Sequence, residues 1–316
     1  GKETSINWRP KKDEMSVSMT TTPIDVYNKQ VSLNGNLLLA SKGLGGNGDA
    51  KFDASNLEAK NFWFKQDAYG SDTADFKLKS DIESVLAIQT KNVNAKIDLV
   101  NRFGNFISNG KGSYVSFPLN QYICYIAQFK WFIDKNEVEF GDENVDKTKV
   151  NIEGSDFVST NAFQDSLRWN AGLARYNLND YLIKARKVKE ILVADASIQP
   201  NDTATIVIEK EAYMRPLYQT KVIANTVSKY HTITSATIQI KGRKEYEGTG
   251  QYAYNDHAGT PHLISLERIG VDTAKQTYAN GNIPETENFQ LSTNIQYKGR
   301  VQINASNPLL NFDGAN

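Results

Sequence analysis

The fold is decided by the stretch Ser235-Ala236-Thr237-Ile238-Gln239-Ile240, in which small or polar residues alternate with apolar ones. Successive side chains of a β-strand point to opposite faces, so this alternation predicts a strand with one buried and one solvated face. The same pattern recurs at residues 92–99, 195–198 and 296–303. We therefore expect an all-β protein built as an elongated stack of short strands.

Turn signals separate the alternating runs. They are Asn34-Gly35, the glycine cluster at 43–48, Tyr69-Gly70-Ser71, Asp134-Lys135-Asn136 and Asn280-Gly281-Asn282. This spacing fits a jelly-roll β-solenoid, a parallel β-helix or a two-lobed β-sandwich. We favour a solenoid, because small residues before the apolar pairs would let neighbouring layers approach closely.

One region allows a second interpretation. Leu182, Ala185, Val188 and Leu192 recur at helical spacing within residues 176–192. We expect strands here, in keeping with the rest of the chain.

The organisation along the chain follows from where the pattern weakens. We expect a peripheral arm at 1–20, a first β lobe at 21–140, a connecting segment at 141–165 and a second β lobe at 166–316. Whether the second lobe continues the first is left open.

The composition excludes some classes of partner. Of the 316 residues, Lys and Arg together number 36, as do Asp and Glu, so no global positive field exists to hold nucleic acid. No apolar run has the length that a membrane-spanning helix needs. Cys124, the only cysteine, lies in an apolar run and is expected to be buried. The opening glycine and the strand-like end suggest a fragment of a longer chain.

The segment Ala174-Arg175-Tyr176-Asn177-Leu178-Asn179-Asp180-Tyr181-Leu182-Ile183-Lys184-Ala185, with its continuation to Ile198, and the segment from Asn94 to Phe106 carry a family resemblance. They resemble the repeats of the lipopolysaccharide-transport and organic-solvent-tolerance (OstA-like) proteins of gram-negative envelopes. The resemblance implies a twisted, stacked jelly-roll that bridges lipid or partner proteins in the periplasm. It covers part of the chain and carries over no functional residue.

No motif predicts catalysis, a cofactor or a metal. The run Gly43–Gly48 matches the G-x-G-x-x-G dinucleotide pattern, but no helix is expected after it, so we interpret it as a hairpin loop. His231, His257 and His262 lack metal-ligand spacing, although Asp256-His257 near His262 would suit a metal corner, and we expect them to be histidines of surface loops. The carboxylates between Asp134 and Asp146 lack the glycine of a calcium loop and predict a solvated acidic edge.

Two aromatic residues are candidates for an exposed binding surface. Alternation places Trp63 on the polar face of its strand, between Phe62 and Phe64, and places Phe132 between Lys130 and Asp134. Such rings could stack on sugars or pack against a neighbouring layer, and we favour packing. The basic runs, at 184–189 and 241–244, have acidic neighbours and predict a mixed solvated face.

These observations predict a non-enzymatic structural or binding component of a bacterial cell envelope, in the periplasm or on the cell surface. Its partners would be another envelope protein or a further part of the same chain, bound through exposed strand edges, with lipid or glycan as further ligands. The alternative is a carbohydrate-binding module or a polysaccharide lyase on a β-helix.

Overall fold

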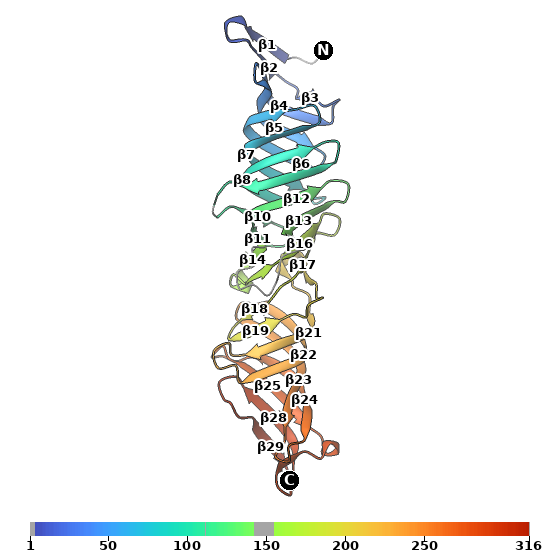
Figure 1. The fold of residues 1–316 in the computed structure, drawn as a ribbon, viewed down its shortest axis with the longest axis vertical. Helices are drawn as coiled ribbons and strands as arrows, with labels where there is room; N and C mark the ends of the chain where they lie inside the picture. Colours follow the sequence, from blue (N-terminus) through green and yellow to red (C-terminus); the bar gives the residue numbers. More distant parts are fainter. Residues whose placement is uncertain (1–3, 111, 142–154, 316) are drawn as a thin grey trace. The chain divides into compact units, whose positions relative to one another are not determined.

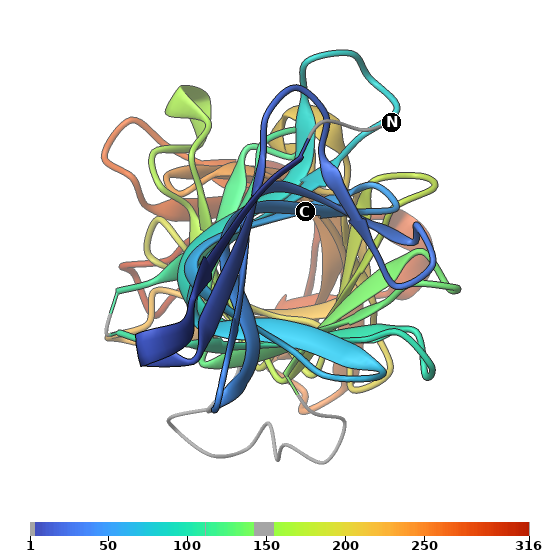
Figure 2. The same cartoon turned by 90° about the horizontal axis from the view of Figure 1, so that it is seen from above.

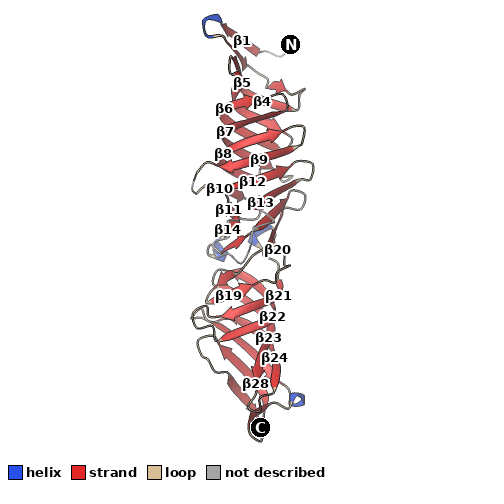
Figure 3. Ribbon diagram, viewed as in Figure 1, coloured by secondary structure: helices blue, strands red, loops and turns tan. Residues whose placement is uncertain are grey.

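The computed structural model describes residues 4–110, 112–141 and 155–315, and these are all-β (Figures 1 and 3). Every strand pairing described is antiparallel, which rules out the parallel β-helix for these strands. Residues 176–192 form strands and turns, so the expectation of strands there is confirmed. The remaining regular structure is four 3₁₀ turns: Pro10–Lys12, Ala162–Gln164, Lys210–Ala212 and Glu285–Glu287.

The chain divides into two compact units. The first holds the described residues of 1–142 and 173–183, and the second those of 143–172 and 184–316. The described residues of the expected peripheral arm at 1–20 belong to the first unit, as does the strand at Leu173–Asn177 from the expected second lobe. Most of the expected connecting segment at 141–165 lies outside the described residues.

The first unit is built of antiparallel strands. These are β1 (Thr4–Arg9), β2 (Glu14–Met19), β3 (Ile24–Val26), β4 (Val31–Ala40), β5 (Gly43–Phe52), β6 (Ser55–Phe64), β7 (Ala68–Lys79), β8 (Leu86–Asp98), β9 (Phe103–Ser108), β10 (Tyr114–Phe117), β11 (Tyr122–Tyr125), β12 (Gln128–Phe132), β13 (Glu137–Gly141) and β16 (Leu173–Asn177). Most of them pair with the next strand along the chain, whereas β8 also pairs with β10, β9 with β12 and β13 with β16. In the view of Figure 2, the hairpin turns of this unit, coloured blue to green, project outward.

Two long strands of this unit, β4 and β8, each pair with two different strands along their length. Residues 36–39 of β4 pair with β2, whereas residues 31–33 pair with β3. In β8, residues 93–98 pair with β9, whereas residues 89–90 pair with β10. Register shifts fall between these halves in β5–β6 and β7–β8, as expected of β-bulges that bend a strand. One sheet is thereby bent into two halves.

Aromatic rings fill the space between the two halves. Phe76, from one half, lies 4.1 Å from Phe106 of the other, measured between ring centroids. Phe117 likewise contacts Phe140 at 5.4 Å. All four side chains are fully buried, and burying each stabilises the fold by about 1.5–3 kcal/mol. This aromatic core holds the bend in place.

Glycines occupy strand positions where backbones approach closely. Gly35 and Gly48 lie opposite each other in β4 and β5, and a Cβ on Gly48 would lie 2.1 Å from the carbonyl oxygen of Asn34. The interpretation of Gly43–Gly48 as a hairpin loop is therefore wrong, because the run is the first half of β5. The turns expected at Asn34-Gly35, Tyr69-Gly70-Ser71 and Asn280-Gly281-Asn282 are wrong for the same reason: each lies inside a strand.

The second unit contains β14 (Ser155–Ser159), β15 (Arg168–Ala171), β18 (Ile191–Val193), β19 (Ala196–Gln199), β20 (Ile206–Ile208), β21 (Leu217–Ala224), β22 (His231–Gly242), β23 (Glu245–Asn255), β24 (Pro261–Val271), β25 (Thr277–Ile283), β26 (Gln290–Ser292), β27 (Ile295–Gln296), β28 (Lys298–Asn304) and β29 (Asn311–Ala315). β17 (Leu182–Arg186) spans the division between the units. From β21 to β25 each strand pairs with the next, and β28 and β29 continue the sheet.

The stretch with the clearest alternation, 235–240, lies in β22, and Ala236, Ile238 and Ile240 are buried as predicted. Hydrogen bonds across the core accompany this packing. The hydroxyl groups of Tyr246 and Thr277 are hydrogen-bonded at 2.7 Å, and the Thr277 hydroxyl donates to Asp195 at 2.6 Å.

Candidate functional site

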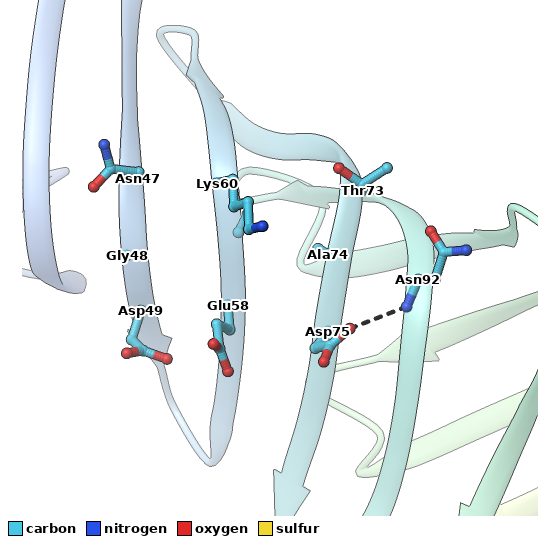
Figure 4. A pocket seen from close by; sticks show the side chains of 10 residues that line it. Asn47, Gly48, Asp49, Glu58, Lys60, Thr73, Ala74, Asp75 and Asn92 are labelled. Atoms are coloured by element: carbon cyan, nitrogen blue, oxygen red, sulfur yellow. Dashed lines mark hydrogen bonds between the residues drawn. The ribbon is translucent and has the colours of Figure 1, made fainter.

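A shallow pocket of about 660 Å³ lies across β5, β6, β7 and β8 in the first unit (Figure 4). It is lined by Asn47, Gly48, Asp49, Glu58, Ala59, Lys60, Thr73, Ala74, Asp75 and Asn92. Glu58 is directly opposite both Asp49 and Asp75 in the register, so three carboxylates stand side by side on neighbouring strands. Like charges placed opposite each other in a sheet destabilise it.

Each carboxylate of this pocket has a partner within the protein. The Asn56 amide donates to Asp49 at 3.2 Å, and the backbone N–H of Asn92 donates to Asp75 at 3.0 Å. The ammonium of Lys77 lies 3.8 Å from Glu58. Over the described parts of the chain, no three His, Cys, Asp or Glu side chains are grouped to hold a metal ion. Each carboxylate of this row therefore already has a hydrogen bond or an ion pair within the protein.

Trp63 lies half-buried in β6, between the buried Phe62 and Phe64. It stands opposite Gly70, where a Cβ would lie 2.6 Å from the indole ring, so the ring covers the glycine. The Lys65 ammonium lies 5.2 Å from the ring centroid. Part of the ring is therefore already occupied by contacts within the protein.

Phe132 is half-buried in β12, opposite Phe103 of β9. The Lys130 ammonium lies 4.2 Å from the Phe103 centroid and 5.0 Å from that of Phe132, and Lys135 adds a second cation at 4.9 Å. Phe129, Trp131 and Ile133 are buried, as alternation predicts. Three strands, β7 to β9, separate β6 from β12 in the pairing order, so Trp63 and Phe132 do not form one row.

His257 lies in an exposed turn, as expected, whereas His231 and His262 lie in β22 and β24, so the expectation of surface-loop histidines is wrong for these two. His262 donates from Nε2 to Asp256 at 2.9 Å, and its Nδ1 lies 3.9 Å from Glu287. His257 instead contacts the hydroxyl of Thr293 at 3.2 Å. The buried Asp256 also accepts hydrogen bonds from backbone amides, so this corner fastens the segment after β25 to the β23–β24 hairpin.

His231 is fully buried and bonded at both ring nitrogens. Its Nε2 lies 2.6 Å from the carbonyl oxygen of Asn307, which only accepts, so Nε2 carries the proton. Nδ1 lies 3.0 Å from the Tyr252 hydroxyl. The residue ties the segment after β28 to the sheet.

Charged side chains of the expected acidic edge and of the second basic run contact opposite charges. Asp134 accepts from Arg102 at 2.5 Å, and Glu139 from Arg175 at 3.0 Å. Asp142, Glu143 and Asp146 of the expected acidic edge lie outside the described residues. In the basic runs, Lys241 contacts Glu247 at 2.7 Å, as expected of a mixed face. Cys124 is fully buried, as predicted.

A second shallow pocket, of about 560 Å³, lies on the second unit. It is lined by Glu267, Arg268, Asn280, Gly281, Asn282, Arg300, Val301, Gln302, Asn311 and Asp313. The sequence reasoning did not find it. Its signal, amides and arginines at alternating positions of successive strands, becomes visible only once the register places them on one face.

β1 and β29 are among the described strands that have one free edge. β1 pairs only with β2, and β29 only with β28. In β1, Ile6 and Trp8 are 65% and 54% exposed. Cross-strand neighbours extend both into apolar rows, Ile6–Val17–Leu37 and Trp8–Met15–Leu39. An edge of this kind is a template for another strand.

The comparisons with known proteins add no assignment. No helix in the described residues is both long and apolar enough to cross a membrane. No family model, no curated protein and no solved structure matches the chain.

Proposed function

We propose that the protein is a non-enzymatic structural or binding component of a bacterial cell envelope, and that each unit is a jelly-roll solenoid of stacked strands. The observation that carries the structural role is the free edge of β1, with Ile6 and Trp8 exposed beside it. An unpaired strand offers a row of backbone donors and acceptors, and the apolar rows behind it supply surface to bury. The occupant of this edge is a strand of another chain.

The envelope assignment, in the periplasm or on the cell surface of a gram-negative bacterium, rests on the resemblance of residues 174–198 and 94–106 to OstA-like repeats. Lipid remains a further ligand under this proposal. The stacked-strand architecture is supported by the bent antiparallel sheet of the first unit and the meander of the second.

The experiment is light scattering across a concentration series. We expect the protein to associate as its concentration rises, and Ile6→Lys to abolish association, because a charge on the edge strand opposes strand addition. Val100→Lys is the matched control, since Val100 is 68% exposed in a turn of the same unit. A wild-type protein that stays monomeric at all concentrations, or equal loss in both variants, would contradict the proposal.

A carbohydrate-binding role is the second candidate, favoured by the polar pocket of the second unit. The lyase form of this alternative assumed a parallel β-helix, which the antiparallel pairings of the described strands do not match. The binding form needs only a groove of suitable polar groups.

A further inference from the structure

Seven polar side chains share one face of β24, β25, β28 and β29. The register aligns Arg268, Asn280, Gln302 and Asn311 in one row across the four strands, and Asn282, Arg300 and Asp313 in a second. Residues two apart on a strand point to the same side, so the two rows are adjacent. Together they surround the pocket of about 560 Å³, with Gly281 and Val301 between them.

Within the described chain, these side chains form no hydrogen bonds or ion pairs with one another. Across the residues that the structure describes, no side-chain hydrogen bond or ion pair involves any of the seven or their neighbour Glu267. The Arg268 guanidinium lies 5.9 Å from the Tyr278 ring centroid. Polar side chains on an exposed face bond water in the free protein, and a ligand that offers the same hydrogen bonds can take the place of that water.

The charges of the groove select against a strongly charged ligand. Arg268 and Arg300 are balanced by Glu267 and Asp313, all of them lining the pocket. The remaining polar groups are the amides of Asn280, Asn282, Gln302 and Asn311, each of which both donates and accepts hydrogen bonds. A sugar hydroxyl also donates and accepts, so rows of amides and arginines match a polyhydroxylated surface.

The scaffold adds preorganisation. All seven side chains stand on paired strands, which hold their spacing before a ligand arrives. The pocket volume lies within the range of roughly 300–1,000 Å³ that small-molecule sites occupy. We propose that this groove is a binding site for a neutral oligosaccharide. The site extends the binding role proposed above and does not depend on the free edge of β1.

The test is calorimetric titration of the whole chain with short malto-, cello-, manno- and xylo-oligosaccharides, and with oligogalacturonides as the charged comparison. We expect at least one neutral series to bind. Asn280→Ala combined with Gln302→Ala should weaken that binding about tenfold or more, because the pair removes two opposed amides from one row. Gln302 is exposed and Asn280 is half-buried, and neither side chain belongs to the apolar core, so we expect the fold to tolerate their removal.

Gln296→Ala is the matched control, because Gln296 is an exposed amide in β27 of the same unit and does not line the groove. It should leave the affinity unchanged. Ile6→Lys should also bind normally, so failure of edge association and failure of sugar binding are distinguishable. The proposal is overturned if no neutral oligosaccharide binds, if only oligogalacturonides bind, or if the double variant binds as well as wild type.

Discussion

The pockets of the two units differ in what their polar groups already bind. In the first unit, Asp49, Glu58 and Asp75 each contact a neighbouring donor (Figure 4). In the second, Arg300 and its row neighbours have no such side-chain partners among the described residues. Both pockets are shallow, open and floored by a glycine, so shape alone does not separate them. The two pockets therefore differ in how far their hydrogen-bonding groups are already paired within the protein, and our proposal of a ligand site rests on that difference.

The largest expected effect is the loss of stability on replacing the glycine that lies in each pocket, Gly48 in the first unit and Gly281 in the second. Gly48→Ala should destabilise the protein by about 3 kcal/mol or more, because a Cβ would lie 2.1 Å from the Asn34 carbonyl oxygen at a φ of +121°. Gly281→Ala should cost less, about 1–3 kcal/mol, since its Cβ would lie 2.6 Å from the Ser265 carbonyl oxygen without a positive φ. Urea denaturation measures both.

Gly110→Ala is the control for these substitutions, because the nearest atom to its Cβ is 3.8 Å away. If Gly48→Ala and Gly110→Ala lowered the free energy of unfolding equally, close backbone approach would not explain the glycine.

The next largest effect concerns the hydrogen-bonded pair Asp256 and His262 in the second unit. Burial alone would raise the pKa of Asp256, but hydrogen bonds from His262 and from the amides of Thr260 and Gln290 hold that pKa below its ordinary value. A lowered folded-state pKa stabilises the fold above the unfolded pKa of about 4, and this stabilisation is lost as pH falls through the folded value. Asp256→Asn should therefore lower the urea midpoint at neutral pH.

The difference between this variant and wild type should shrink as pH falls below about 4, because the stabilisation is lost as the folded wild-type carboxyl becomes protonated. Asp272→Asn offers a control, since Asp272 makes turn hydrogen bonds without a histidine. A pH-independent difference between Asp256→Asn and wild type would refute the assignment of the effect to this carboxylate.

The smallest effect concerns the carboxylate row of the first unit. Asp75→Asn keeps an oxygen to accept the Asn92 N–H and removes one charge opposite Glu58. We expect stabilisation by up to about 0.5 kcal/mol at low salt, fading as salt screens the repulsion. Thermal denaturation at low and high salt measures it. Destabilisation at low salt would show that the row is held by attraction, for instance to a bound cation.

Alternation predicted the strands and their faces well, because it depends on local geometry alone. It placed Phe129, Trp131 and Ile133 inside correctly. It failed at glycines such as Gly35 and Gly281, which resemble turn residues but sit in strands because a neighbouring backbone leaves no space for a Cβ. That cause is a contact between strands, and single-chain patterns do not contain it.

The candidate sites show the same limit. Trp63 and Phe132 were assigned to polar faces, yet their rings are partly covered by Gly70 and by lysines that only the folded sheet brings together. The amide rows of the second unit depend on register between four strands, so no single segment reveals them.

The strands shared between the two halves of the bent sheet have a consequence for cooperativity. Because β4 and β8 each contribute hydrogen bonds to both halves, opening one half disturbs strands that also belong to the other. Amide hydrogen exchange in residues 88–90 and 95–98 should accordingly proceed through one common opening event, with matched protection on both sides of the bend. The first unit would then unfold as one cooperative unit, although its sheet is bent into two halves.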